Sequence, residues 1–138
     1  MTKKSVCVGQ EARVSRTITA DDVETFARLS LDRNPIHFDE SFAANTLFGK
    51  RIAHGMLGMA LVSGALTELM GAGNIWISSA MKFEKPIFID DTLSCTLTVS
   101  AVDRRGLADI EVRVKNEQGE IIISGSVKSM CFVGRACR

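Results

Sequence analysis

The sequence predicts an α+β fold in which a curved antiparallel sheet wraps around one long apolar helix. Two observations support this prediction. Residues 92–132 hold three strand patterns joined by short turns, and such turns connect antiparallel neighbours because a parallel crossover needs about a dozen residues or more. Residues 52–70 form an apolar segment whose ionisable side chains are His54 and Glu68. A helix that is apolar around its circumference has to be covered by other elements.

The N-terminal part of the chain predicts a strand followed by a helix. Apolar residues alternate over 12–18, as is typical of a strand, although Arg16 interrupts the pattern. Thr19 and Asp22 have the three-residue spacing of a helix start, and an apolar stripe at helical spacing follows them. We expect this helix to end near Leu31.

A loop, a short helix and the long helix are expected next. Residues 32–38 contain Pro35, which cannot continue a helix because it lacks the backbone N–H. Asp39 can cap a short helix that runs to Ala44. The long helix is expected to begin around Gly55 and to be buried on nearly all sides by the sheet.

The second half of the chain predicts a four-strand antiparallel meander. Strand patterns occupy residues 75–83, 93–101, 108–114 and 121–132. Polar turns that contain glycine separate the last three, and Pro86 ends or bulges the first. Together with the long helix, this arrangement is the hot-dog fold, in a single domain of residues 1–138.

Composition excludes several classes of protein. Apolar residues make up 46% and charged residues 24%, close to the average for globular proteins, so a disordered tail or a low-complexity array is excluded. The chain has 17 Lys and Arg against 16 Asp and Glu, without a basic cluster, and aromatic residues are 6%. We therefore expect no nucleic-acid partner.

We expect the protein to be cytoplasmic and without a membrane anchor. Residues 52–70 approach the length of a membrane-spanning helix, but three glycines dilute their hydrophobicity and soluble-type strands follow. The N-terminus has no apolar run behind its positive charges, so no signal peptide is expected. The cysteines lack metal or redox spacing, and we expect reduced thiols at all four: Cys7, Cys95, Cys131 and Cys137.

The densest group of chemically capable residues is the segment 32–37, Asp-Arg-Asn-Pro-Ile-His. Asp32 and His37 lie five residues apart in a non-helical stretch, so both can face one small volume. Histidine titrates near neutrality, and a carboxylate can orient its ring and share a proton. Alternatively, Asp32 ends the preceding helix and His37 packs under the next. No metal is expected, because His54 is the other histidine and no third ligand has suitable spacing.

Two further candidates lie on the long helix. The backbone N–H groups at Gly55 have no intrahelical partner and carry the positive end of the helix dipole. A glycine also lets a substrate oxygen approach closely, which suits a thioester carbonyl that becomes an oxyanion. The alternative for Gly55 is an ordinary helix start. Ser63 lies two turns on, where its hydroxyl can instead bond its own helix backbone.

These residues resemble a known family. Residues 26–37, the Phe-Ala-Ala of 42–44 and the His-Gly-Met-Leu of 54–57 are similar to the hydratase motif of the MaoC-like dehydratases. Within that group the chain most resembles the short (R)-specific enoyl-CoA hydratases that feed polyhydroxyalkanoate synthesis. The resemblance runs from about Glu11 to the strands near Phe132. Leu31 stands where many members have glycine before the aspartate.

The resemblance implies a hot-dog homodimer that adds water to a trans-2-enoyl thioester and forms the (3R)-3-hydroxyacyl product. It assigns Asp32 and His37 to hold and activate the water and to shuttle the proton to C2. It assigns the Gly55 N–H to polarise the thioester oxygen, and Ser63 to line the site as a hydrogen-bond partner. No cofactor is expected, because the thioester itself acidifies C2 and water is the other reactant.

Asn34 and His54 are the candidates for substrate binding and for support of the catalytic loop. The expected substrate is an enoyl-CoA or a 3-hydroxyacyl-CoA. Three alternatives to this hydratase function stay open. A (3R)-hydroxyacyl-ACP dehydratase performs the same chemistry on a carrier protein, and no motif separates the two. Thioester hydrolysis would need a carboxylate or a water at the carbonyl instead of at C3. The spacing of Asp32 and His37 does not exclude it, but the family motif argues against it. A non-catalytic acyl-thioester-binding subunit conflicts with the intact Asp–His pair.

Overall fold

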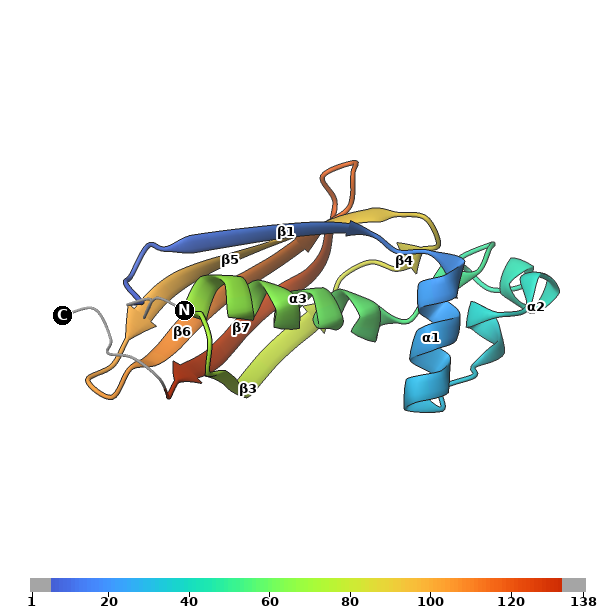
Figure 1. Cartoon of the computed structure of the whole chain (residues 1–138). Helices are drawn as coiled ribbons and strands as arrows, with labels where there is room; N and C mark the ends of the chain where they lie inside the picture. The colour runs from blue at the N-terminus through green and yellow to red at the C-terminus, as the bar shows by residue number, and fades with distance from the viewer. Residues whose placement is uncertain (1–5, 133–138) are drawn as a thin grey trace.

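The computed structural model describes residues 6–132 (Figure 1). A five-stranded antiparallel sheet curves around the longest helix, which lies along its concave side. In spatial order the strands are β1 (Glu11–Thr17), β5 (Thr92–Val102), β6 (Leu107–Lys115), β7 (Ile121–Cys131) and β3 (Asn74–Phe83). The other elements are α1 (Ala20–Ser30), the 3₁₀ turn η1 (Pro35–His37), α2 (Glu40–Ala44), β2 (Ile52–Ala53), α3 (Gly55–Met70) and β4 (Ile87–Phe88).

Helix α1 begins at the position that the sequence indicates. The Thr19 hydroxyl accepts a hydrogen bond from the Asp22 N–H, and the Asp22 carboxylate accepts one from the Thr19 N–H at 2.9 Å. This reciprocal pair is a capping box, which satisfies two backbone donors that have no helical partner. The helix ends at Leu31, which adopts a left-handed conformation with φ of 65°. Figure 1 shows α1, η1 and α2 at one end of the sheet, beside the N-terminal end of α3.

Helix α3 packs one side against the sheet and leaves the other side uncovered. Its buried residues, among them Val62, Leu66 and Leu69, join the core formed by the inward side chains of β5, β6 and β7. A stripe on the opposite side is exposed: Met56, Ala60, Ser63, Gly64 and Thr67. In the isolated chain, the expectation of a helix buried on nearly all sides is therefore wrong. Small, weakly polar residues on the uncovered side made that side look like a buried one.

The strands pair antiparallel throughout, but the expected four-strand meander is wrong in one respect. Strands β5, β6 and β7 follow one another in space as in the chain, whereas β3 pairs with β7 and not with β5. Its register sets Ser79 opposite Val127. The connection from β3 to β5 runs through β4, which pairs with β2 just before α3. Alternation identifies a strand but carries no information about which neighbour it pairs with.

The structure also bears on the membrane and cysteine expectations. No helix within residues 6–132 is long and apolar enough to cross a membrane. Cys7 is disulfide-bonded, so the expectation of reduced thiols is wrong at that position. Cys95 is a buried thiol, and burial raises its pKa to about 12. Cys137 lies outside the described residues. Residues 1–5, which begin the segment where no signal peptide is expected, lie outside them as well. The cytoplasmic location stays a prediction.

Candidate active site

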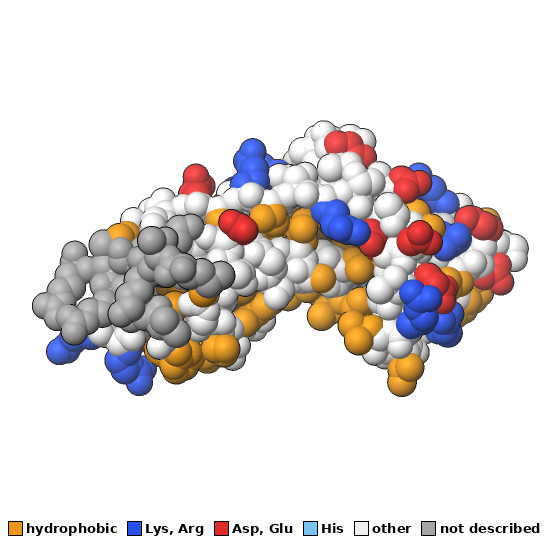
Figure 2. Space-filling model, viewed as in Figure 1, with side chains coloured by type: hydrophobic (Ala, Val, Ile, Leu, Met, Phe, Trp, Pro, Cys, Tyr) orange, Lys and Arg blue, Asp and Glu red, His pale blue; other side chains and the backbone are white. Residues whose placement is uncertain are grey.

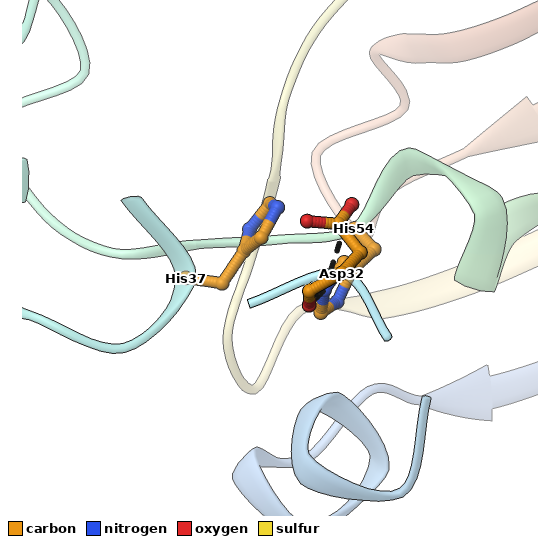
Figure 3. Close-up of side chains that lie close together, drawn as sticks. All are labelled: Asp32, His37 and His54. Atoms are coloured by element: carbon orange, nitrogen blue, oxygen red, sulfur yellow. Dashed lines mark hydrogen bonds and ion pairs between the residues drawn. The ribbon is translucent and has the colours of Figure 1, made fainter. Parts of the chain in front are cut away.

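The segment between α1 and α2 brings two candidate residues against the start of α3. Asp32, His37 and His54 each offer one side-chain nitrogen or oxygen atom that could bind a metal, and these three atoms lie within 4.8 Å of one another. Figure 3 shows the His37 side chain reaching toward the close pair formed by Asp32 and His54. Residues 22 positions apart in the chain thus form one cluster of polar side chains.

Local hydrogen bonds build the turn that carries His37. The Asn34 side chain accepts a hydrogen bond from the Ile36 N–H at 3.2 Å, which caps η1, and Pro35 fixes the first residue of the turn. The Asp32 carboxylate accepts a hydrogen bond from the Asn34 N–H at 3.1 Å. Asn34 therefore stabilises the turn that carries His37, and its role in the active site stays a prediction.

The His37 ring is held in one orientation and one tautomer. Nδ1 lies 2.8 Å from the carbonyl oxygen of Ile52, and since a carbonyl can only accept, Nδ1 carries the proton. The Arg51 guanidinium donates to the His37 carbonyl at 2.7 Å and fixes the backbone beside it. Nε2 is thus left with its lone pair, which is the arrangement that a general base needs. Neither Ile52 nor Arg51 could be recognised from the sequence.

Burial keeps His37 neutral. Its side chain is 7% exposed, and desolvation is the main cause that lowers its pKa below the usual value of 6.5. The hydrogen bond to Ile52 and the Asp32 charge oppose this shift, while His54 and Arg51 add to it. His37 can therefore accept a proton near neutral pH instead of already carrying one.

His54 connects the other members of the cluster. It is 2% exposed, and its Nε2 lies 3.0 Å from the backbone carbonyl oxygen of Asp32, to which it donates. Its ring stacks on that of His37 at 3.8 Å between centroids and contacts the Phe26 ring at 4.7 Å. His54 Nδ1 keeps a lone pair and has no hydrogen-bond partner among the described residues. His54 thus supports both candidate acid–base residues.

The Asp32 carboxylate is half exposed, in contrast to the two histidines, and lies 4.0 Å from His54 Nε2. It faces solvent on one side, from which a water molecule can enter. The sequence spacing indicates no third ligand for a metal, yet the structure places this carboxylate within reach of both imidazoles. The three residues could hold an ion, although one nitrogen of each histidine already bonds a backbone carbonyl.

Gly55 is the first residue of α3 and directly follows His54. The His54 side chain makes no capping hydrogen bond, so the N–H groups of the first turn are not occupied by it. Gly55 lines a pocket of about 480 Å³ together with Met56 and Phe83. An added Cβ at Gly55 would lie 2.9 Å from Cδ1 and Cε1 of the Phe83 ring. A small residue at this position therefore keeps both the N–H and the pocket open.

Ser63 lies apart from the cluster in a single chain. It is exposed on the uncovered side of α3, eight residues after Gly55, which corresponds to about 12 Å along a helix. The structure therefore brings Asp32, His37, His54 and Gly55 together but does not add Ser63 to them. Its role in the site stays a prediction.

The chain is similar to known proteins of one family. Residues 4–120 match the family described as MaoC like domain. An (R)-specific enoyl-CoA hydratase from Aeromonas caviae is 37% identical over 127 residues, which cover 91% of this chain and 95% of the relative. An (R)-specific enoyl-CoA hydratase from Rhodospirillum rubrum is 43% identical over 95 residues, which cover 68% of this chain and 66% of the relative.

The fold of the chain is similar to that of solved structures. The R-hydratase from Pseudomonas aeruginosa in its unliganded form has a TM-score of 0.86 and 35% identity, and the match covers 91% of this chain and 82% of that chain. The (R)-hydratase from A. caviae involved in PHA biosynthesis has a TM-score of 0.87 and 36% identity, covering 93% and 98%. The chain therefore shares the fold of these hydratases over nearly its whole length.

Proposed function

The chain belongs to the MaoC-like domain family and has its hot-dog fold, and from this we propose that it is an (R)-specific enoyl-CoA hydratase. The reaction adds water reversibly to a trans-2-enoyl-CoA and gives (3R)-3-hydroxyacyl-CoA. The observation that supports it most is the cluster of Asp32 and a neutral His37 beside Gly55 at the start of α3. That cluster supplies acid–base groups next to a free backbone donor.

In the proposed mechanism, a water molecule is held between the Asp32 carboxylate and Nε2 of His37. As one proton leaves the water, its oxygen bonds to C3 of the substrate, and the electrons of the double bond move onto the thioester oxygen. The Gly55 N–H donates to that oxygen, helped by the dipole of α3. The proton taken from water then passes from the acid–base pair to C2. The hydroxyl and the hydrogen of one water molecule are thereby added across C2 and C3.

We further propose that the working unit is a homodimer joined through β3. This strand forms an edge of the sheet, and it carries three apolar side chains that are each 51% exposed, Ile75, Ile77 and Phe83. Figure 2 shows apolar side chains gathered on the lower side of the molecule, over α3 and β3. Exposed edges and apolar patches of this kind are normally covered. A second copy would cover β3 and the uncovered side of α3 that carries Ser63.

The product belongs to the class of (3R)-hydroxyacyl thioesters from which polyhydroxyalkanoates are built, and we propose that supply of such monomers is the physiological role. The test of the activity is a hydration assay with crotonyl-CoA, in which the absorbance of the conjugated enoyl thioester decreases. We expect hydration, with the R enantiomer of 3-hydroxybutyryl-CoA recovered on chiral analysis. Absence of turnover across C4 to C12 enoyl-CoAs, or an S product, would overturn the proposal.

A further inference from the structure

Two neighbouring pockets form a continuous groove that starts at Gly55. The first, of about 480 Å³, contains Gly55, and the second, of about 410 Å³, contains Lys50. Lys85, Pro86 and Ile122 line both pockets, so the two meet there. We call this feature the Gly55–Lys50 groove. It leads away from the acid–base cluster, whose three side chains line neither pocket.

The character of the groove changes along its length. Near Gly55 most of the lining side chains are apolar, among them Ile52, Met56 and Phe83, and the charged side chains there are Glu84 and Lys85. At the far end it is bordered by charged and amide side chains, including Lys50, Lys85, Asp91, Asn116 and Glu120. An elongated ligand that is uncharged near its reacting end and charged at its other end matches this order.

The small ribbon of β2 and β4 sets the distance between the two ends. Ile52 pairs with Phe88, and the Lys50 ammonium lies over the Phe88 ring at 4.4 Å from its centroid. Gly55 lies five positions after Lys50, so their Cα atoms are at most about 18 Å apart. A pantetheine arm, which is an extended chain interrupted by amide groups, spans a comparable distance between a thioester and a phosphate.

The charge on Lys50 is available at this end of the groove. Lys85 and Glu120 form an ion pair, and the Asp91 carboxylate accepts a hydrogen bond from the Phe88 N–H at 2.9 Å. Within residues 6–132 Lys50 forms no ion pair, and its contact with the Phe88 ring holds the ammonium in place without neutralising it. Among the described residues Lys50 is thus a positioned cation without an ion-pair partner, although the Asp91 and Glu120 carboxylates line the same pocket.

We infer that the Gly55–Lys50 groove holds the pantetheine arm of the acyl-CoA and that Lys50 binds a phosphate of its nucleotide end. This assignment rests on the proposed function, since a thioester oxygen at Gly55 fixes where the arm begins. Lys85 stands where the two pockets meet and adds a second positive charge beside the arm, partly offset by Glu120. The acid–base residues are separate from this contact, so the two can be altered independently.

The test compares substrates that share the reacting group but differ in phosphate. Hydration rates of the full chain are measured with crotonyl-CoA and with crotonyl-pantetheine, which lacks every phosphate. Lys50→Gln is expected to raise KM for crotonyl-CoA about threefold to tenfold with kcat nearly unchanged, and to leave kcat/KM for crotonyl-pantetheine unchanged. Lys50→Arg should retain most of the affinity. Lys115→Gln, at an exposed lysine on the outer face of the sheet, is the matched control and should leave kcat and KM unchanged for both substrates.

Two outcomes would overturn the assignment. One is an equal effect of Lys50→Gln on both substrates, or none on either. The other is an effect seen with crotonyl-carrier protein but not with crotonyl-CoA, which would place a protein surface at Lys50. If the wild-type chain hydrates neither thioester, the proposed function fails. Calorimetry then measures the binding of free CoA to the wild type and to Lys50→Gln, and weaker binding by the variant supports the Lys50 assignment separately.

Discussion

The imidazole rings of His37 and His54 stack at 3.8 Å between centroids with an angle of 32° between their planes. Both rings are almost fully buried, and each donates one ring N–H to a backbone carbonyl. Because positive charges on two rings at this distance would repel each other, His54 adds to the causes that lower the pKa of His37, of which burial is the largest. The stack thus holds His37 in position and favours its neutral form, which is the form that the proposed role as a base uses.

Removing either member of the acid–base pair should abolish most of the activity. Asp32→Asn cannot accept the proton from water, and His37→Gln retains a polar side chain but no titratable nitrogen. Each is expected to lower kcat for crotonyl-CoA about 10²–10⁴-fold, the usual contribution of general acid–base groups. Circular dichroism and thermal melting should show the native fold for both. A near-normal kcat in either variant would refute the assignment of that residue.

The lowered pKa of His37 predicts how activity depends on pH. The neutral form is the active base, so kcat/KM for hydration should stay constant as pH falls past 6.5 and decrease only at the lower pKa of the folded protein. The profile of kcat/KM between pH 4.5 and 8 measures this. An acid limb centred above 6.5 would contradict it.

The same shift has a consequence for stability. Between the lowered pKa of folded His37 and the ordinary value of 6.5, the unfolded chain binds more protons, so the free energy of unfolding decreases as pH falls through that window. His37→Gln should remove this part of the pH dependence, as urea unfolding of both proteins at several pH values would show. An unchanged slope in the variant would mean that other groups cause it.

The elements of the fold could be predicted because their signals are local. The capping box at Thr19 and the alternation in β5 and β6 are read within a dozen residues. The pairing of β3 with β7 could not be predicted, since alternation does not name a neighbour. Nor could the uncovered side of α3, because Ala60 and Gly64 are compatible with either burial or exposure.

The site was predictable to a similar extent. Asp32, His37 and Gly55 carry side chains or a backbone position whose chemistry the sequence states directly. The contacts that orient them involve backbone carbonyls, those of Ile52 and Asp32, and any residue supplies a carbonyl. Sequence spacing therefore could not reveal the tautomer of His37 or the support from His54.

Leu31 is expected to reduce stability, because it adopts a left-handed conformation with φ of 65° that is costly for a branched side chain. Its side chain is 85% exposed, so its removal leaves no cavity. Leu31→Gly should increase the free energy of unfolding by about 1 kcal/mol, or raise Tm by about 3 °C. Asp90→Gly, at φ of 73°, is the control and should increase the free energy of unfolding by less, because aspartate tolerates this conformation. A lower Tm in Leu31→Gly would contradict the prediction.

A charge on the exposed edge strand should separate the proposed dimer. Ile77 on β3 is half exposed in one chain, and Ile77→Lys places a solvated ammonium where the second copy would pack. We expect sedimentation to show the wild type as a dimer and the variant as a monomer with reduced activity. Leu29→Lys on α1, where Leu29 is 83% exposed, should leave both unchanged. A wild type that is fully active as a 15.0 kDa monomer would refute the dimer.

Substitution of Gly55 tests the oxyanion contact. During hydration, negative charge moves from the attacked double bond to the thioester oxygen, and in the proposed mechanism the Gly55 N–H at the start of α3 donates to that oxygen. Gly55→Val leaves this N–H in place but puts a branched side chain beside it. We expect kcat/KM for crotonyl-CoA to fall about 10²–10³-fold, the usual cost of losing an oxyanion donor. Because Phe83 is a half-exposed, flexible side chain, its ring can move and the fold should survive.

The contact between an added Cβ and Phe83 offers a second explanation for such a loss, and a double variant separates the two. In Gly55→Val the displaced ring could itself block the pocket, since the Cβ would lie 2.9 Å from its Cδ1 and Cε1. Adding Phe83→Ala removes the ring but not the valine beside the N–H. Phe83 lines the Gly55–Lys50 groove and belongs to the proposed dimer contact, so Phe83→Ala alone is the reference for the double variant. If Gly55 donates to the oxyanion, kcat/KM of the double variant stays well below that of Phe83→Ala. Recovery of activity in the double variant would mean that the moved ring caused the loss and that the oxyanion is bound elsewhere.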